Sequence, residues 1–157
     1  MVELQLVGVR VELPTNQPIV LLKEQGGERY LPIWIGPYEA TAIAYGMQGI
    51  ETPRPLTHDL IRDLLAGLDV SVQRIVITEL RDGTYYAEIQ MIRDGTPSAV
   101  SSRPSDAIAL ATRLRVSIFC NDEVLEEASI VVKDDEEQEV EKFREFLEQV
   151  SPEDFKP

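Results

Sequence analysis

The chain has one histidine, His58, which stands among residues suited to proton transfer and phosphate binding. Arg54 and Pro55 precede it, Asp59 follows it directly, and Asp63 lies one helical turn further on. A histidine beside a carboxylate can carry a proton, and the start of a helix favours a bound anion. The structural alternative is that His58 is an ordinary surface or packing residue, and that Asp59 only complements the helix dipole.

A second polar cluster, Ser102-Arg103-Pro104-Ser105-Asp106, opens another helix that is otherwise apolar. We expect this helix to be buried, so its polar start should point into a crevice or be held by partners. Arg103 and Ser105 could contact a phosphate, and Asp106 could bind a hard cation. The alternative is that Asp106 caps the helix and Arg103 is its salt-bridge partner.

Glu39 is the third candidate, because it lies near the start of its own expected helix. If the three helix starts converge, Glu39, Asp59 and Asp106 could hold Mg²⁺ or Mn²⁺ in one site. Arg54 and Arg103 could then neutralise a phosphodiester, which lowers its repulsion of hydroxide. The sequence has no P-loop, dinucleotide fingerprint, paired-histidine zinc motif or nucleophile elbow, and it gives those reaction classes no support.

Strands are expected on both sides of these helices, from alternating apolar residues and from turn signals. Two Asp-Gly pairs and one Gly-Gly pair mark tight turns between them. The expected strands are 2–13 with a bulge near Gly8, 19–22, 30–35, 70–80, 85–92, 99–100, 116–120 and 130–132.

The helices are located by their start and stop signals. One follows Pro37 and ends near residues 46–49, one has Thr57 as its N-cap, and one begins at Pro104. The second carries an apolar stripe of Leu60, Ile61, Leu64, Leu65 and Leu68. Residues 121–128 should add one or two helical turns. The sequence thus predicts an α+β fold, with a mainly antiparallel sheet of bulged strands and hairpins packed with three core helices.

The sequence of the C-terminal segment predicts an amphipathic helix that packs against the rest of the protein or against a partner. It follows an acidic linker at 134–139 and stops at Pro152. Its apolar residues fall at helical spacing: Val140, Phe143, Leu147 and Val150. We divide the chain into an α+β domain, 1–133, and an acidic linker with a C-terminal helix, 134–157.

Composition narrows the functional classes. The 157 residues carry a net charge of −13, which argues against a general electrostatic grip on nucleic acid. Much of the acid lies in residues 121–157, so the first 120 residues could still carry a local cationic site. Cys120 is the one cysteine, which excludes an intramolecular disulfide or a zinc-thiolate cluster, and its apolar surroundings predict a core thiol. We expect no membrane insertion or export, and hence a cytoplasmic protein.

Three strings in this order resemble the bifunctional nuclease domain family, over roughly residues 1–133. They are Leu31-Pro32-Ile33-Trp34-Ile35-Gly36 with Glu39-Ala40, Arg54-Pro55-Leu56-Thr57-His58-Asp59-Leu60, and Ser102-Arg103-Pro104-Ser105-Asp106-Ala107-Ile108-Ala109-Leu110-Ala111. The resemblance implies divalent-metal-dependent hydrolysis of DNA and RNA by a homodimer. The positions that match the family's polar signature are Glu39, Arg54, His58, Asp59, Arg103, Ser105 and Asp106.

The chain departs from the family pattern in one place and extends beyond it in another. Family members commonly carry an acidic residue where this chain has Ser101, so a metal ligand or polar contact is absent there. The segment after residue 133 resembles an extension found in actinobacterial members.

Two functions are compatible with the sequence. In the first, the protein is a metal-assisted nuclease, with Glu39, Asp59 and Asp106 as metal ligands and His58 as proton carrier. In the second, it is a non-enzymatic homodimeric scaffold or regulatory module that binds a protein partner or small anion. At least two of the three carboxylates should share one cation-sized space in a nuclease, whereas separate salt bridges would favour the module.

Overall fold

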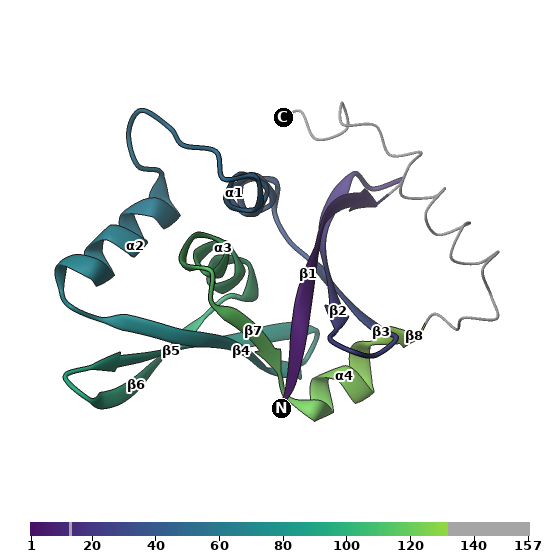
Figure 1. Ribbon diagram of the computed structural model, residues 1–157. Helices are drawn as coiled ribbons and strands as arrows, with labels where there is room; N and C mark the ends of the chain where they lie inside the picture. The colour runs from purple at the N-terminus through teal and green to yellow at the C-terminus, as the bar shows by residue number, and fades with distance from the viewer. Residues whose placement is uncertain (13, 132–157) are drawn as a thin grey trace.

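A computed structural model describes residues 1–12 and 14–131. Within these residues one eight-stranded sheet has the order β6-β5-β4-β7-β1-β2-β3-β8. The sheet is strongly bent, with α1, α2 and α3 on one side and α4 on the other (Figure 1). The α+β fold with a mainly antiparallel sheet is thereby confirmed.

The N-terminal strands form an antiparallel meander. β1 (Val2–Glu12) pairs with β2 (Gln17–Glu24), and β2 pairs with β3 (Arg29–Trp34). The register of β1 shifts between Leu6 and Gly8, which confirms the bulge expected from the change in apolar alternation. Because β3 alternates, it buries Leu31 and Ile33 in the core and leaves Trp34 exposed at its end.

The central strands form a second meander, joined to the first by one short strand. β4 (Ser71–Arg81), β5 (Thr84–Arg93) and β6 (Thr96–Ser102) turn at the two Asp-Gly pairs, as predicted. β7 (Ser117–Cys120) runs parallel to β4 and antiparallel to β1, and so joins the two meanders into one sheet. β8 (Ile130–Val131) adds to the edge at β3.

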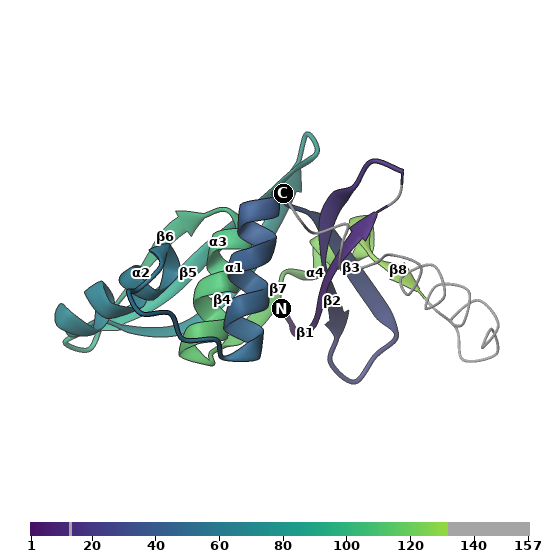
Figure 2. The ribbon, with the colours of Figure 1, turned by 90° about the horizontal axis from the view of Figure 1, so that it is seen from above.

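The helices α1 (Pro37–Gln48) and α3 (Pro104–Leu114) lie side by side over the sheet, with α2 (Thr57–Gly67) outside α3 (Figure 2). α3 is the central core helix, since every residue from Ala107 to Ala111 is buried. Gly46 allows α1 to approach it, because a Cβ at that position would collide with the side chain of Thr112. α4 (Asp122–Ala128) supports the opposite face of the sheet.

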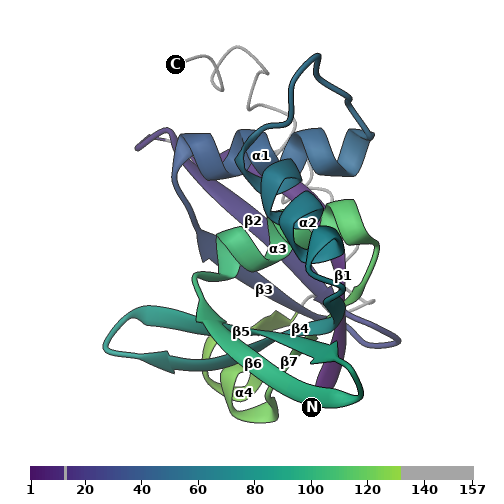
Figure 3. The same ribbon diagram turned by 90° about the vertical axis from the view of Figure 1, so that its left-hand side faces the viewer.

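Two details of α2 differ from the sequence prediction. The N-cap is Leu56 rather than Thr57, and the Asp59 carboxylate at the third helical position accepts the Leu56 backbone N–H at 3.0 Å. The apolar stripe packs only in part: Leu60, Leu64 and Leu68 remain about half exposed (48%, 55% and 54%). Figure 3 shows α2 in front of α3, and none of the other described elements covers its outer side.

Cys120 is completely buried, and burial raises the pKa of its thiol to about 12, so the expected core thiol is confirmed. None of the helices in the described ranges has the length and apolar character needed to cross a membrane. The predicted C-terminal helix and the domain boundary after residue 133 lie outside the described residues.

Candidate functional site

Arg103 joins the starts of two helices. It is the N-cap residue of α3, and its guanidinium binds Asp106 in the first turn of the same helix. Nε donates to Asp106 Oδ2 at 2.9 Å, and Nη2 donates to Oδ1 at 3.2 Å. Nη1 donates to Glu39 Oε1, in the first turn of α1, at 3.0 Å. Glu39 folds back over Gly36, where any Cβ would collide with its carboxylate.

The third helix start reaches the same cluster through His58. Its Nε2 lies 3.0 Å from Asp106 Oδ1, and the residue is only 8% exposed. Burial alone would raise the pKa of the Asp106 carboxyl, but hydrogen bonds from Arg103 and His58 outweigh burial and hold that pKa below its ordinary value. Asp106 is therefore an anion held between an imidazole and a guanidinium.

Asp59 lies in a different environment from the other two carboxylates. Its Oδ1 accepts a hydrogen bond from Arg113 Nε at 2.6 Å, and its Oδ2 accepts the Leu56 N–H that caps α2. Burial would raise the pKa of the Asp59 carboxyl, but the Leu56 and Arg113 hydrogen bonds outweigh it and lower that pKa. Asp59 borders a cavity of about 230 Å³ together with Pro55, Arg62 and other residues of that loop.

Arg113 was not a candidate from the sequence. Its side chain is 5% exposed, and Nη1 donates to the carbonyls of Ala42 (3.0 Å) and Ala109 (2.8 Å) while Nε binds Asp59. It thereby ties α3 to α1 and α2. The one signal for it was an arginine in the last turn of a helix expected to be buried, since such a charge needs partners inside the protein.

The remaining predicted residues divide between the cluster and its surroundings. Arg54 lies exposed between α1 and α2, and within the described residues its side chain forms no ion pair. Ser105 is buried and lines a cavity of about 380 Å³ that Arg103 also lines. Trp34 from β3 and Tyr85 from β5 complete its wall. Ser101 lies on β6 opposite Glu88 of β5.

The expected three-carboxylate metal site is not formed in this arrangement. Across residues 1–12 and 14–131, no group of three or more His, Cys, Asp or Glu side chains is placed to hold a metal ion. Glu39 and Asp106 offer the oxygen ligands that Mg²⁺ and Mn²⁺ prefer, but both are bound to Arg103. The donors fit such an ion by type, and Arg103 would compete with it for both carboxylates.

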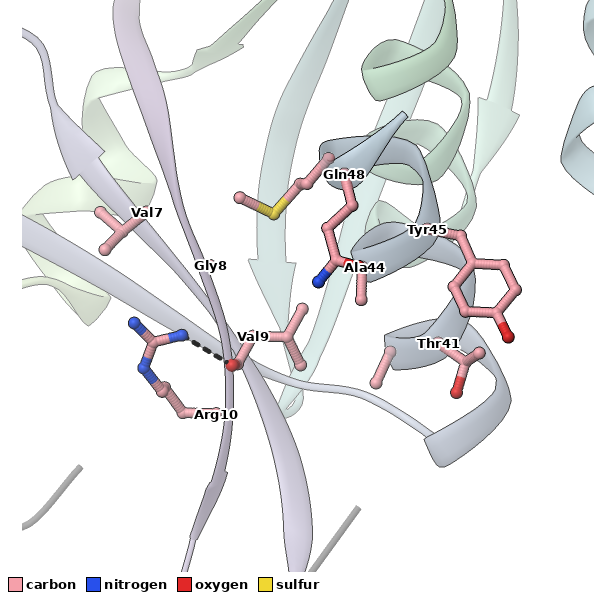
Figure 4. A pocket seen from close by; sticks show the side chains of 10 residues that line it. Val7, Gly8, Val9, Arg10, Thr41, Ala44, Tyr45 and Gln48 are labelled. Atoms are coloured by element: carbon pink, nitrogen blue, oxygen red, sulfur yellow. Dashed lines mark hydrogen bonds between the residues drawn. The ribbon is translucent and has the colours of Figure 1, made fainter. Parts of the chain in front are cut away.

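Another cavity, of about 500 Å³, lies between the bulge of β1 and α1 (Figure 4). Val7, Val9 and Ala44 give it a largely apolar wall, and Arg10 beside it donates to the Val9 carbonyl at 2.8 Å. It contains none of the residues predicted to carry chemistry. The cleft bordered by Arg103 is therefore the better candidate site.

Proteins similar to this chain occur in a mycobacterium and in rice. The sequence model of the bifunctional nuclease domain matches residues 20–133. An uncharacterized protein of Mycobacterium tuberculosis is 50% identical over 163 residues, which cover 98% of both chains. Bifunctional nuclease 1 of Oryza sativa is 28% identical over 109 residues, or 68% of this chain and 33% of the plant protein. Bifunctional nuclease 2 of the same plant is 27% identical over 106 residues, 65% of this chain and 33% of its own length. The chain belongs to the bifunctional nuclease domain family.

Proposed function

We propose that this protein is a nuclease that hydrolyses phosphodiester bonds of DNA and RNA in the cleft beside Arg103. The family and the names of the plant relatives support the activity. The observation that carries the placement is the convergence of three helix starts on one network, Glu39–Arg103–Asp106–His58, at the edge of that cleft.

Arg103 can bind a phosphate without leaving its carboxylates. A guanidinium has five N–H donors, and the three bonds to Glu39 and Asp106 use one from Nε and one from each Nη. One N–H on each Nη is left for a phosphate oxygen. The side chain is 64% exposed, so a substrate can reach these donors. Arg103 would neutralise the charge that grows on phosphorus-bound oxygens in the transition state.

His58 would accept the proton of the attacking water, and Asp106 would assist it. In hydrolysis, the oxygen of water bonds to phosphorus, the P–O ester bond breaks, and the water proton leaves while the departing oxygen gains one. If His58 Nε2–H donates to Asp106, Nδ1 is the ring nitrogen that can accept a proton. The anionic Asp106 would stabilise the imidazolium that results.

Mg²⁺ or Mn²⁺ belongs to the proposal as a cofactor that Glu39 and Asp106 would hold, where it would supply Lewis-acid stabilisation of the phosphate. Such binding requires Arg103 to release at least one of them. Asp59 could join only by giving up Arg113 and the Leu56 cap. Arg54, which is exposed and close to His58 in sequence, is proposed as a second phosphate contact.

The direct test is hydrolysis of single-stranded DNA and of RNA by highly purified protein, with Mg²⁺, with Mn²⁺ and with EDTA. Cleavage in either metal and its loss in EDTA would support the whole proposal. Cleavage that persists in EDTA would contradict the metal requirement but would still support nuclease activity. No cleavage of either nucleic acid under any condition would overturn the proposal.

The second candidate function is a non-enzymatic homodimeric module, and the exposed leucines of α2 favour the dimer that it requires. Exposed apolar patches on a folded protein commonly mark an interface, and a two-fold dimer places the same patch of each copy against the other. We propose that Leu60, Leu64 and Leu68 contact the same three residues of a second copy of this chain. The dimer is compatible with either function.

We also propose that the protein is cytoplasmic, because a buried free thiol needs no oxidising compartment.

Leu64→Glu should therefore convert the dimer into a monomer, or weaken it at least about tenfold, because it buries a charge without a partner in the interface. Molar mass measured by light scattering after gel filtration checks this. Gln48→Glu, an equal charge change at an exposed position of α1, should leave the mass unchanged. A wild-type protein that is monomeric at micromolar concentration would contradict the proposal.

A further inference from the structure

Trp34 is the chain's one tryptophan, and it lies at the rim of the candidate site. Its neighbours Ile33 and Ile35 are 3% and 7% exposed, whereas Trp34 is 47% exposed. A tryptophan carries a large apolar area, and leaving half of it in water forgoes stabilisation that burial would provide. The side chain borders the same cavity as Arg103 and Tyr85, so it lies within the proposed reaction cleft.

We propose that Trp34 is a stacking platform for an unpaired base, and that the substrate of this site is single-stranded nucleic acid. The inference rests on the proposed function for its substrate, and its own evidence is the exposed ring of Trp34 in the cleft that Arg103 borders. The bases of a duplex are stacked on one another inside the helix, and they reach a protein aromatic ring only when unpaired or flipped out. An aromatic ring at the cleft therefore selects strands whose bases are already free.

Charge also favours this mode of binding. Among the described residues that line the cleft, Arg103 is the one cation, and the whole chain has a net charge of −13. A duplex binder normally neutralises many phosphates at once, and the described lining of this cleft offers one guanidinium for them. Stacking is independent of sequence and does not depend on charge, because every base has a π-face. One phosphate contact plus one stacked base is thus the combination that this cleft can provide.

The cleft has room for such a ligand. Its volume of about 380 Å³ falls in the range of small-molecule sites, which suits one nucleotide. Trp34 and Tyr85 come from different strands, β3 and β5, so two aromatic side chains border the space beside the guanidinium. An inserted base would lie against an aromatic wall while its phosphate reaches Arg103.

Trp34 itself reports the binding, because its fluorescence is the only tryptophan signal. In EDTA, to suppress metal-dependent cleavage, a twelve-nucleotide oligothymidylate or its RNA counterpart should quench that fluorescence with saturation. A duplex of the same length should not. Anisotropy of labelled oligonucleotide should show roughly 5- to 150-fold weaker binding by Trp34→Ala, with Trp34→Phe close to wild type. With about one phosphate neutralised, the slope of log K against log salt should be near −0.7.

Tyr38→Ala is the matched control. Tyr38 is 84% exposed on α1 and does not line the cleft, so its removal should leave oligonucleotide binding unchanged. Equal thermal stability of Trp34→Ala and wild type excludes misfolding. Wild-type affinity in Trp34→Ala, equal quenching by duplex, or an equal loss in Tyr38→Ala would each overturn the proposal.

The two proposals can fail separately. Saturable quenching of the Trp34 fluorescence by single strands, in a protein that cleaves neither DNA nor RNA, would support the stacking site and contradict the proposed nuclease activity. If Trp34→Ala cleaves with unchanged KM and an unchanged ratio of single- to double-strand cleavage, the stacking proposal is contradicted and the proposed nuclease activity is supported.

Discussion

Asp106→Asn should lower kcat for cleavage of DNA and RNA by about 100- to 10,000-fold, the usual contribution of a general acid–base system. Asparagine keeps the shape of the side chain but cannot hold an imidazolium at His58 or orient Arg103 through two anionic oxygens. The effect should appear in kcat more than in KM, because the lost interactions strengthen as charge develops on the substrate. Initial rates on a fluorogenic single-stranded DNA and on RNA measure it.

The control is Asp63→Asn. Asp63 is an exposed carboxylate of α2 that binds Arg62 at 3.1 Å and does not touch the Arg103 cluster, so its activity should match wild type. All three proteins are purified identically. If Asp106→Asn, Asp63→Asn and wild type cleave at the same rate, the activity comes from a contaminating nuclease and the assignment of the site fails.

The sequence predicted the fold where local chemistry decides it. The Asp-Gly pairs adopt positive φ at both residues, and the two hairpins expected there form. The position of β7 could not be read in this way. Its parallel pairing with β4 and antiparallel pairing with β1 join segments about forty and over one hundred residues away, and no short-range pattern encodes those partners.

The candidate site shows the same division. Local sequence identified Glu39, His58, Arg103 and Asp106 as polar residues at helix starts, and the structure brings these four together. It could not separate Asp106 from Asp59, because each is an acidic residue in the first turn of a helix. The difference is set by two arginines of α3. Arg103 lies three residues before Asp106, so sequence spacing suggests that pair, whereas Arg113 meets Asp59 only because α2 packs against α3, which sequence spacing does not give.

Arg113→Met should lower the free energy of unfolding by about 3–5 kcal/mol, the usual cost of breaking one side of a buried ion pair. Both partners are largely buried, with side chains 5% and 16% exposed, so little solvent screening reduces the effect. The variant leaves the Asp59 carboxylate without its guanidinium, and it removes one donor from the carbonyls of Ala42 and Ala109. Urea denaturation followed by circular dichroism measures the change. Arg62→Met, at an exposed arginine 4.0 Å from Asp59, should cost less than about 1 kcal/mol.

The pH dependence of stability separates this ion pair from a simple loss of packing. The folded-state pKa of Asp59 is lower than the ordinary 3.8, so its contribution is present above that pH and is lost as pH falls through the folded pKa. Wild type should lose stability as pH falls below about 4, and Arg113→Met should lose less over the same interval. The double variant Arg113→Met/Asp59→Asn should be more stable than Arg113→Met alone, because it no longer buries an unpaired charge. If the double variant is instead as unstable as the two single losses added together, Arg113 acts through packing, and Asp59 is free to serve the reaction.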